Sequence, residues 1–367
     1  MINRERLIEE FIALTEFDCE SFAEKEIAAY LRKELDGLGL EVFSDSAENI
    51  FAVLPATRGF ENKEAVLFSA HMDTVKPGIG KKAVRHADGR ISSDGTTVLG
   101  ADDAAGLAEI VEALRAIKEE GLSHGRIEIV FFAAEEPYCR GSSVFDPSVL
   151  TAKYGYVLDL TGKVGTAAVS APTIMGLEVR VKGKSAHAGF EPEAGINALS
   201  VAAAALSKIP AGRTFSDGEN ATLNFGIVNG GTAPNIVPEE IRLSGEIRSL
   251  NDGAAEKLCG GIKQVFLDEA GKLGASVDFK AEKKVKAYRV SENGEAAEKF
   301  IRAAKKTGLE PVLTVTYGGS DANRLNEWGI PSIVLANAMM NVHTVSEYTE
   351  EEEMYAAAKL VLLLMNT

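Results

Sequence analysis

Short apolar runs alternate with longer amphipathic stretches along the chain as far as Asp159. Residues 64–70 (EAVLFSA) form a run too apolar for an exposed strand, and residues 126–134 (RIEIVFFAA) form another. The stretches 21–39 and 98–120 place their apolar residues at helical spacing. Strands that alternate with helices predict an α/β fold, in which helices cover both faces of a mostly parallel sheet.

The hydrophobic pattern changes at about Met175. From there, strands and two helices follow one another with hairpin-like connections, over residues 176–189, 196–209, 221–231, 240–250, 254–274 and 275–288. This order is typical of a small α+β domain. Helix and strand alternation resumes after Ser291. We therefore expect a small domain, residues 173–287, to be inserted into a larger domain formed by residues 1–172 and 288–367.

Histidine and acidic side chains stand where the predicted strands end. His71 and Asp73 directly follow the run 64–70. In open α/β sheets, ligands bind at the carboxyl ends of the strands. The imidazole of His71 can bind a cation while the carboxylate of Asp73 fixes the tautomer of the ring. The alternative is a loop histidine bonded to a neighbouring aspartate.

Two pairs of consecutive acids occupy comparable positions. Asp102 and Asp103 begin a predicted helix, where such a pair commonly caps the helix, although one aspartate can also bridge two cations. Glu135 and Glu136 end a buried strand, which is costly unless a positive charge faces them. Because consecutive side chains diverge, one glutamate can bind metal while the other holds an attacking water.

Two further candidates complete the series. Asp159 ends the run 154–158, and His343 lies a few residues past the apolar run that begins at Ile330. Each could be incidental, but so many potential ligands at strand and helix ends together predict a metal-dependent hydrolase.

The motifs HMDT, LGADDAAG and AAEEP, followed by Asp159 and His343, resemble the ligand series of the two-zinc exopeptidases that include peptidase T, carboxypeptidase G and aminoacylase. The order and rough spacing match over nearly all of the chain. DGTTVLGADDAAG and GGSDANRLNEWGIP are most similar to the peptidase T branch. Ala104 departs from the pattern, since many relatives carry lysine after the aspartate pair, but that position is not a ligand.

The resemblance implies a site for two divalent ions. Its ligands form two overlapping sets, namely His71, Asp102 and Asp159 for one ion and Asp102, Glu136 and His343 for the other. Glu135 is then the general base, and Asp73 orients His71. We expect zinc, because mixed histidine and carboxylate sites suit it, although manganese or cobalt can occupy the same ligands.

The resemblance also implies substrate-binding residues. In relatives, the histidine corresponding to His187 stabilises the oxyanion, sometimes from a partner subunit, whereas a histidine beside small residues in a turn is more often structural. Asn235 and Arg248 resemble positions that hold the substrate backbone or its carboxylate, and Arg324 resembles a residue that lines the substrate cleft. The resemblance also implies that the inserted domain is a lid. It leaves open whether two copies of the chain form a homodimer through this domain.

Composition limits the other partners. The chain has 367 residues and a net charge of -15, which argues against nucleic acid because phosphate binding needs a basic face. Its charged start is not a secretory signal, and no apolar run approaches the ~18 residues that cross a membrane, so we expect a cytoplasmic protein without a membrane partner. The three cysteines lack disulfide or metal spacing. Cys139 is interpreted as an ordinary thiol, and His124 as an exposed histidine.

Three function hypotheses follow. The first is an aminopeptidase that acts on short peptides, tripeptides above all, as the resemblance to peptidase T implies. The second is a carboxypeptidase or N-acyl-amino-acid deacylase, in which Arg248 or Arg324 would bind a free carboxylate. The third is a metal-bound binding protein that has lost catalysis, although such a protein has no need to keep Glu135 beside the ligands.

Overall fold

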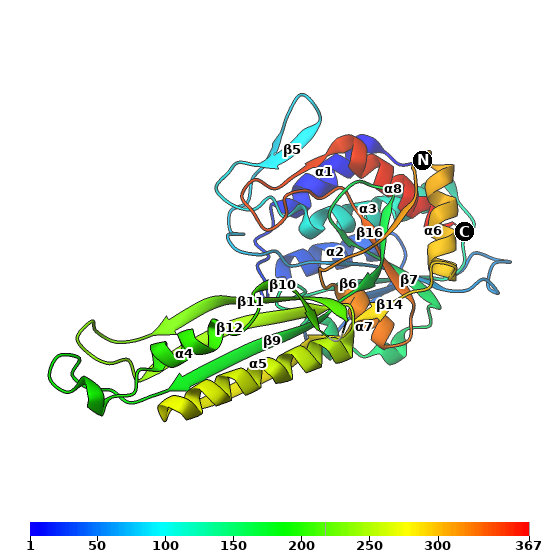
Figure 1. Ribbon diagram of the computed structural model, residues 1–367. Coiled ribbons are helices and arrows are strands. Elements are labelled where there is room, and N and C mark those ends of the chain that lie inside the picture. Colours follow the sequence, from blue (N-terminus) through cyan, green and yellow to red (C-terminus); the bar gives the residue numbers. More distant parts are fainter. Residues whose placement is uncertain (217, 367) are drawn as a thin grey trace. The chain divides into compact units, whose positions relative to one another are not determined.

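The computed structural model describes residues 1–216 and 218–366, and these residues divide into two compact units (Figure 1). Unit 1 comprises Met1–Ser170, Arg289–Thr316 and the segment that begins at Ser320. Unit 2 comprises Ala171–Tyr288 and Tyr317–Gly319. Unit 2 therefore interrupts the sequence of unit 1, which confirms the prediction of a small inserted domain.

A nine-stranded sheet forms the centre of unit 1. Its strands are β1 (Glu41–Ser44), β2 (Ile50–Leu54), β3 (Val66–His71), β6 (Ile127–Phe132), β7 (Tyr154–Leu160), β8 (Thr166–Ala171), β14 (Tyr288–Arg289), β15 (Val312–Val315) and β16 (Ser332–Ala336). The order is β1-β2-β6-β3-β7-β16-β8-β14, with β15 beside β8. The central strands β6, β3, β7 and β16 are parallel, whereas β1 pairs antiparallel with β2, β2 with β6, and β8 with β16. The predicted parallel sheet is thus found at the centre, and the sheet as a whole is mixed.

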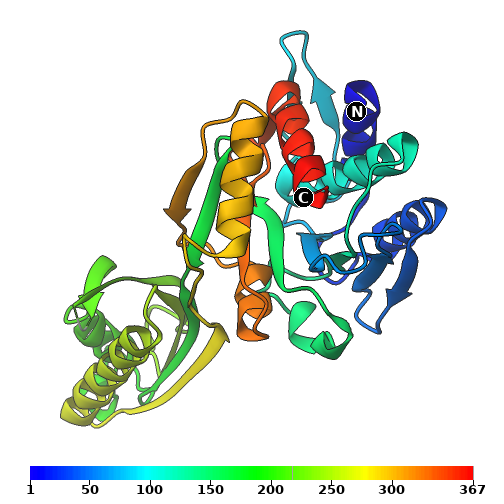
Figure 2. The same cartoon turned by 90° about the vertical axis from the view of Figure 1, so that its right-hand side faces the viewer.

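Helices lie on both faces of this sheet. They are α1 (Arg4–Thr15), α2 (Lys25–Gly37), α3 (Ala101–Glu120), α6 (Glu295–Lys306), α7 (Asp321–Glu327) and α8 (Glu351–Met365). On one face α8 contacts both α3 and α6, and Figure 2 shows α6 and α8 side by side. The hydroxyl of Tyr156 in β7 donates to a carbonyl of α6 on that face.

The short helix α7 covers the opposite face. The strand register places Ile129 of β6 on the same face as Tyr156, because both pair with Phe68. Phe132 is three residues beyond Ile129 and therefore points to the other face, since side chains alternate along a strand. There its ring lies 6.4 Å from that of Trp328, at the end of α7. No helix in the described part of the chain has the length and apolarity needed to cross a membrane.

The chain also forms a small three-stranded sheet and three short 3-10 turns. The sheet has the order β17-β5-β4, formed by β4 (Ala83–Arg85), β5 (Arg90–Ser93) and β17 (Tyr348–Glu350). The 3-10 turns are η1 (Ser142–Val144) and η2 (Pro147–Val149) in unit 1 and η3 (Pro192–Ala194) in unit 2.

Unit 2 is an antiparallel sheet with two helices. Its strands are β9 (Thr173–Lys182), β10 (Gly212–Ser216), β11 (Glu219–Gly230), β12 (Glu240–Ser249) and β13 (Ser276–Val285), in the order β10-β11-β12-β9-β13. The helices are α4 (Ala198–Leu206) and α5 (Asp252–Leu273). In β9 the alternate residues Leu177, Val179 and Val181 are buried and pack in one core with Phe266 of α5. The two helices that the sequence predicted are found, and β10 is a strand beyond those in the predicted ranges.

Candidate metal centre

The parallel strands at the centre of unit 1 bring the predicted ligands together. His71 is the last residue of β3, Glu135 and Glu136 follow β6, and Asp159 is the last residue but one of β7. These strands are adjacent and parallel in the order β6-β3-β7, so their carboxyl ends lie at one edge of the sheet. That edge is where ligands bind in open α/β sheets.

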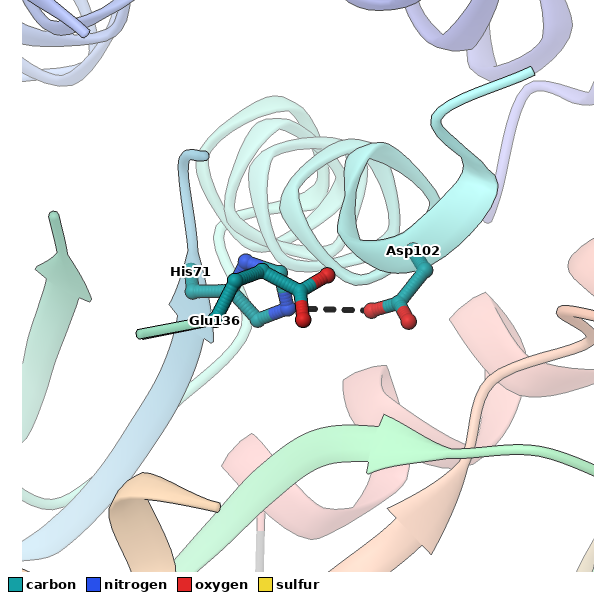
Figure 3. Close-up of side chains that lie close together, drawn as sticks. All are labelled: His71, Asp102 and Glu136. Atoms are coloured by element: carbon teal, nitrogen blue, oxygen red, sulfur yellow. Dashed lines mark hydrogen bonds and ion pairs between the residues drawn. The ribbon is translucent and has the colours of Figure 1, made fainter. Parts of the chain in front are cut away.

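Asp102 lies between two histidines. Its Oδ1 is 2.9 Å from Nε2 of His71, and its Oδ2 is 3.1 Å from Nε2 of His343. The same nitrogen of His343 lies 3.0 Å from Oε1 of Glu136. Figure 3 shows His71, Asp102 and Glu136 pointing toward one another, with the contact between His71 and Asp102 dashed. Each oxygen of one carboxylate thus faces a different histidine, as a bridging ligand requires.

Two groups of side chains are close enough to share an ion. His71, Asp102 and Glu136 each place one potential ligand atom within 4.8 Å of the others, and so do His71, Glu135 and Asp159. The first group draws on both predicted ligand sets. The second places Glu135, which was predicted to be the base, beside His71 and Asp159 of the first predicted set.

The electrostatics of the cluster favour a bound cation. Burial raises the pKa of Glu135 and of Asp159 well above the usual range, and nearby carboxylates raise both further. Burial alone would raise the pKa of Asp102, but hydrogen bonds to His343 and His71 outweigh burial and lower this pKa. Hydrogen bonds to Asp102 and Glu136 raise the pKa of His343 to about 10. Oxygen and imidazole donors crowded in this way, with more carboxylates than histidines, fit divalent metal ions.

Asp73 connects the ends of two strands. Its Oδ1 accepts the N–H of Glu135 at 2.8 Å, and its Oδ2 accepts the N–H of Glu136 at 3.2 Å and the hydroxyl of Ser21 at 2.7 Å. Nδ1 of His71 is 3.0 Å from the backbone oxygen of Asp73 and 3.4 Å from its Oδ1. The carboxylate therefore supports both the histidine and the paired glutamates.

Glu347 is a supporting residue that the sequence did not reveal. Its carboxylate accepts the N–H of Asp102 at 2.9 Å and that of Gly100 at 2.8 Å. These bonds hold the start of α3, where Asp102 has a non-helical backbone and joins Asp103 through a cis peptide bond. Glu347 is 245 residues from Asp102 in sequence, and no local pattern marks it.

Asp103 has a similar supporting position. Its Oδ2 accepts the N–H of His71 at 3.1 Å, and its Oδ1 accepts the side-chain amide of Asn337 at 2.6 Å. The sequence showed the aspartate pair. It did not show that one aspartate faces the histidine rings and that the other accepts a backbone N–H.

Unit 2 contains three of the predicted substrate-binding residues. His187 and Asn235 lie on neighbouring segments, because His187 bridges to Ile236 and the carbonyl of Asn235 accepts the N–H of Ala188 at 2.9 Å. Both residues are exposed. Arg248 donates to Glu246 at 2.7 Å and to the backbone oxygen of Tyr317 at 2.9 Å.

Arg324 lies in α7 of unit 1, where it donates to Glu327 at 2.9 Å. His124 corrects an expectation of exposure: it is only 4% exposed, and its Nδ1 lies 2.7 Å from the carbonyl of Gly125. The three cysteines, Cys19, Cys139 and Cys259, are free and buried.

The sequence matches Peptidase family M20/M25/M40 over residues 67–367. The chain belongs to this family. One relative is the uncharacterised protein YqjE of Bacillus subtilis, which is 37% identical, with 100% of this chain and 99% of the relative covered. Another is peptidase T of Geobacillus kaustophilus, which is 25% identical, with 98% of this chain and 97% of the relative covered.

Two solved structures are similar to this one over the whole chain. Aminopeptidase PepT from Bacillus cereus has a TM-score of 0.89 and 39% identity, and a tripeptidase from Staphylococcus aureus has a TM-score of 0.94 and 33% identity. In both comparisons 100% of this chain and 98% of the other are covered. The chain is thus a peptidase T-like member of the family and an enzyme that hydrolyses peptide bonds, which removes the hypothesis of a non-catalytic binding protein.

Proposed function

We propose that the chain is a metal-dependent aminopeptidase that acts on short peptides, tripeptides above all. The observation that carries the proposal is Asp102, whose two oxygens face His71 and His343 separately within a cluster of buried carboxylates. The substrate class is supported by the two similar structures, one of an aminopeptidase and one of a tripeptidase.

The proposed ligands are those that the sequence indicated: His71, Asp102 and Asp159 for one divalent ion, and Asp102, Glu136 and His343 for the other. When bound, two such ions would polarise the scissile carbonyl and lower the pKa of a water toward neutrality. Zinc suits the mixed donors, and manganese or cobalt would be accepted by the same residues.

Glu135 is proposed to move the proton. It would take a proton from the attacking water and deliver it to the departing amine. Its backbone N–H is bonded to Asp73, which keeps the residue next to the ligand cluster. Burial and the neighbouring Asp159 raise its pKa well above the usual range, which suits a carboxylate that must take up a proton.

His187 is proposed to donate to the oxyanion. Its Nδ1 accepts the backbone N–H groups of Gly189 and Phe190, each at 3.1 Å, so the ring proton lies on Nε2 and is available as a donor. Removal of one such donor typically costs ~10²–10³ in rate. Asn235, Arg248 and Arg324 are proposed to bind the substrate, and in an aminopeptidase they would hold its backbone.

The alternative is a carboxypeptidase or an N-acyl-amino-acid deacylase on the same scaffold. It would depend on Arg248 or Arg324 to bind a free carboxylate. Both arginines already form ion pairs, with Glu246 and Glu327 respectively, so a substrate carboxylate would have to compete with these acids.

The proposal is tested by measuring the rates at which the metal-loaded protein cleaves free, N-acetylated and C-amidated tripeptides. An aminopeptidase must recognise the free α-ammonium group, so we expect the acetylated peptide to be cleaved slowly and the amide to be cleaved well. A lost charge-assisted bond is worth roughly 1.5–3 kcal/mol, or about ten- to a hundredfold in kcat/KM. Rapid cleavage of the acetylated peptide with slow cleavage of the amide would establish the alternative instead.

A further inference from the structure

The thiol of Cys139 lies against the carboxylate of Glu135. Sγ is 3.3 Å from Oε1 and donates to it, and Cys139 is only 1% exposed. We propose that Cys139 is a positioning residue, which holds the general base in place through this S–H···O hydrogen bond. The inference rests on the proposed function, because it takes Glu135 to be the base.

The loop after β6 is shaped to place this thiol. Tyr138 and Cys139 both have positive φ angles, 67° and 55°, which residues other than glycine seldom adopt. The N–H of Cys139 donates to the carbonyl of Glu135 at 2.6 Å, which turns the chain back toward the strand end. At Gly141 the chain passes so close to the residue after β6 that a Cβ would lie 1.9 Å from the carbonyl oxygen of Ala133. These constraints hold the loop against the residue that its cysteine contacts.

The carboxylate of Glu135 needs a donor. It is buried, and the nearby acids Asp159, Asp321 and Glu136 all repel its charge. Its own backbone N–H is bonded to Asp73 and is therefore committed elsewhere. The thiol of Cys139 supplies a side-chain hydrogen bond to this carboxylate.

A thiol is suited to this position. Its S–H is a weak donor, so it orients Oε1 without withdrawing much of the basicity that proton transfer requires. Burial and the adjacent Glu135 raise the pKa of Cys139 well above its ordinary value, so the sulfur keeps its proton and remains a donor rather than a nucleophile.

Steady-state kinetics of the metal-loaded holoenzyme on a free tripeptide test the inference. We expect Cys139→Ala to lower kcat by about fivefold, the effect of one ordinary hydrogen bond, with KM and metal content almost unchanged. Cys139→Ser keeps a donor and should recover most of the loss. The matched control is Cys259→Ala, since Cys259 is a buried thiol in the separate core of unit 2. The kcat of this variant should equal that of the parent protein.

Equal losses of kcat in the alanine and serine variants would overturn the inference in favour of packing, and an unchanged kcat in Cys139→Ala would overturn it outright. Because the alanine variant could fail to fold, the S–H stretch of Cys139 provides a second measurement. In infrared difference spectra assigned with Cys139→Ser, the band should shift to higher frequency in Glu135→Gln, where the acceptor is no longer charged. A band that does not move would show that the thiol does not bond the carboxylate.

The two proposals fail in different ways. If the metal-loaded parent does not cleave a free tripeptide, the aminopeptidase proposal fails, yet the infrared shift still reports the hydrogen bond. If the parent cleaves the peptide and Cys139→Ala keeps its full kcat, only the role of Cys139 is refuted.

Discussion

At the scale of single residues, the cluster assigns different tasks to side chains that look alike in the sequence. Asp102 faces both histidine rings, whereas its neighbour Asp103 accepts the backbone N–H of His71. Glu136 contacts His343, whereas Glu135 contacts the thiol of Cys139. Substitution of one member of each pair therefore has a distinct expected result.

Glu135→Gln should abolish turnover and leave the metal content nearly unchanged. A positioned base typically contributes ~10²–10⁴ in rate, so we expect kcat to fall within or beyond that range. Metal analysis beside a peptidase assay measures both quantities. Since Glu135 also lies within reach of His71 and Asp159, loss of about half of the metal would show that it is a ligand instead.

Asp102→Ala should lose both ions, because each of its oxygens faces a different histidine. His343→Ala should weaken mainly one of the two. Titration with a chelator, followed by metal analysis, distinguishes the two patterns. If Asp103→Ala released more metal than Asp102→Ala, the assignment within the pair would be reversed.

Metal binding should release a proton from His343. In the metal-free protein its pKa is raised to about 10, so near neutral pH the ring is charged, and the proton competes with the metal. Metal affinity should therefore rise as pH increases and level off near pH 10. Calorimetry in buffers of different ionisation enthalpy counts the protons released, and His343→Ala should release fewer than the parent.

At the scale of elements, the site depends on close packing between α3 and β7. Gly106 is in the first helical turns of α3, and a Cβ there would lie 2.5 Å from Oδ1 of Asp103 and 2.8 Å from the carbonyl of Leu158. The absence of a side chain lets the helix approach the strand that carries Asp159, and so brings Asp102 within range of the other ligands.

Gly106→Ala should destabilise unit 1 by ~1–3 kcal/mol, the usual cost of overpacking. Denaturant unfolding measures the loss. Gly260→Ala is the matched control, because Gly260 lies within α5 with no atom near the added Cβ, and there alanine should be neutral or stabilising by about 0.5–1 kcal/mol. Equal stabilities for the two variants would refute the close contact at Gly106.

At the scale of the whole molecule, two units with separate cores share one chain. The candidate ligands all lie in unit 1, while the core of unit 2 is formed by its own sheet and the helices α4 and α5. A ligand that binds only the folded form of unit 1 stabilises that unit by mass action.

Addition of metal should therefore raise the midpoint of one thermal transition and leave the other in place. At a free metal concentration of 100 times Kd, the free energy of unfolding of unit 1 should increase by about 2.7 kcal/mol. Calorimetry with and without a chelator measures the shift, and in Asp102→Ala it should disappear. A parallel shift of the whole unfolding curve would show that the two units unfold together.

Much of this protein is determined by the local sequence. The change from helix and strand alternation to an antiparallel pattern marks the inserted unit, because side-chain periodicity follows directly from backbone geometry. His71, Glu136 and Asp159 were identifiable because each stands at the end of an apolar strand, and parallel strands bring their carboxyl ends to one edge.

The tertiary structure alone decided the contacts between distant segments. Glu347 reaches the backbone of Asp102 across 245 residues, and His124 is buried although it lies in a polar loop. Cys139 contacts Glu135 from a loop in which Tyr138 and Cys139 both have positive φ angles. None of these features repeats with a helical or strand period, so they depend on how the elements pack rather than on the pattern along the chain.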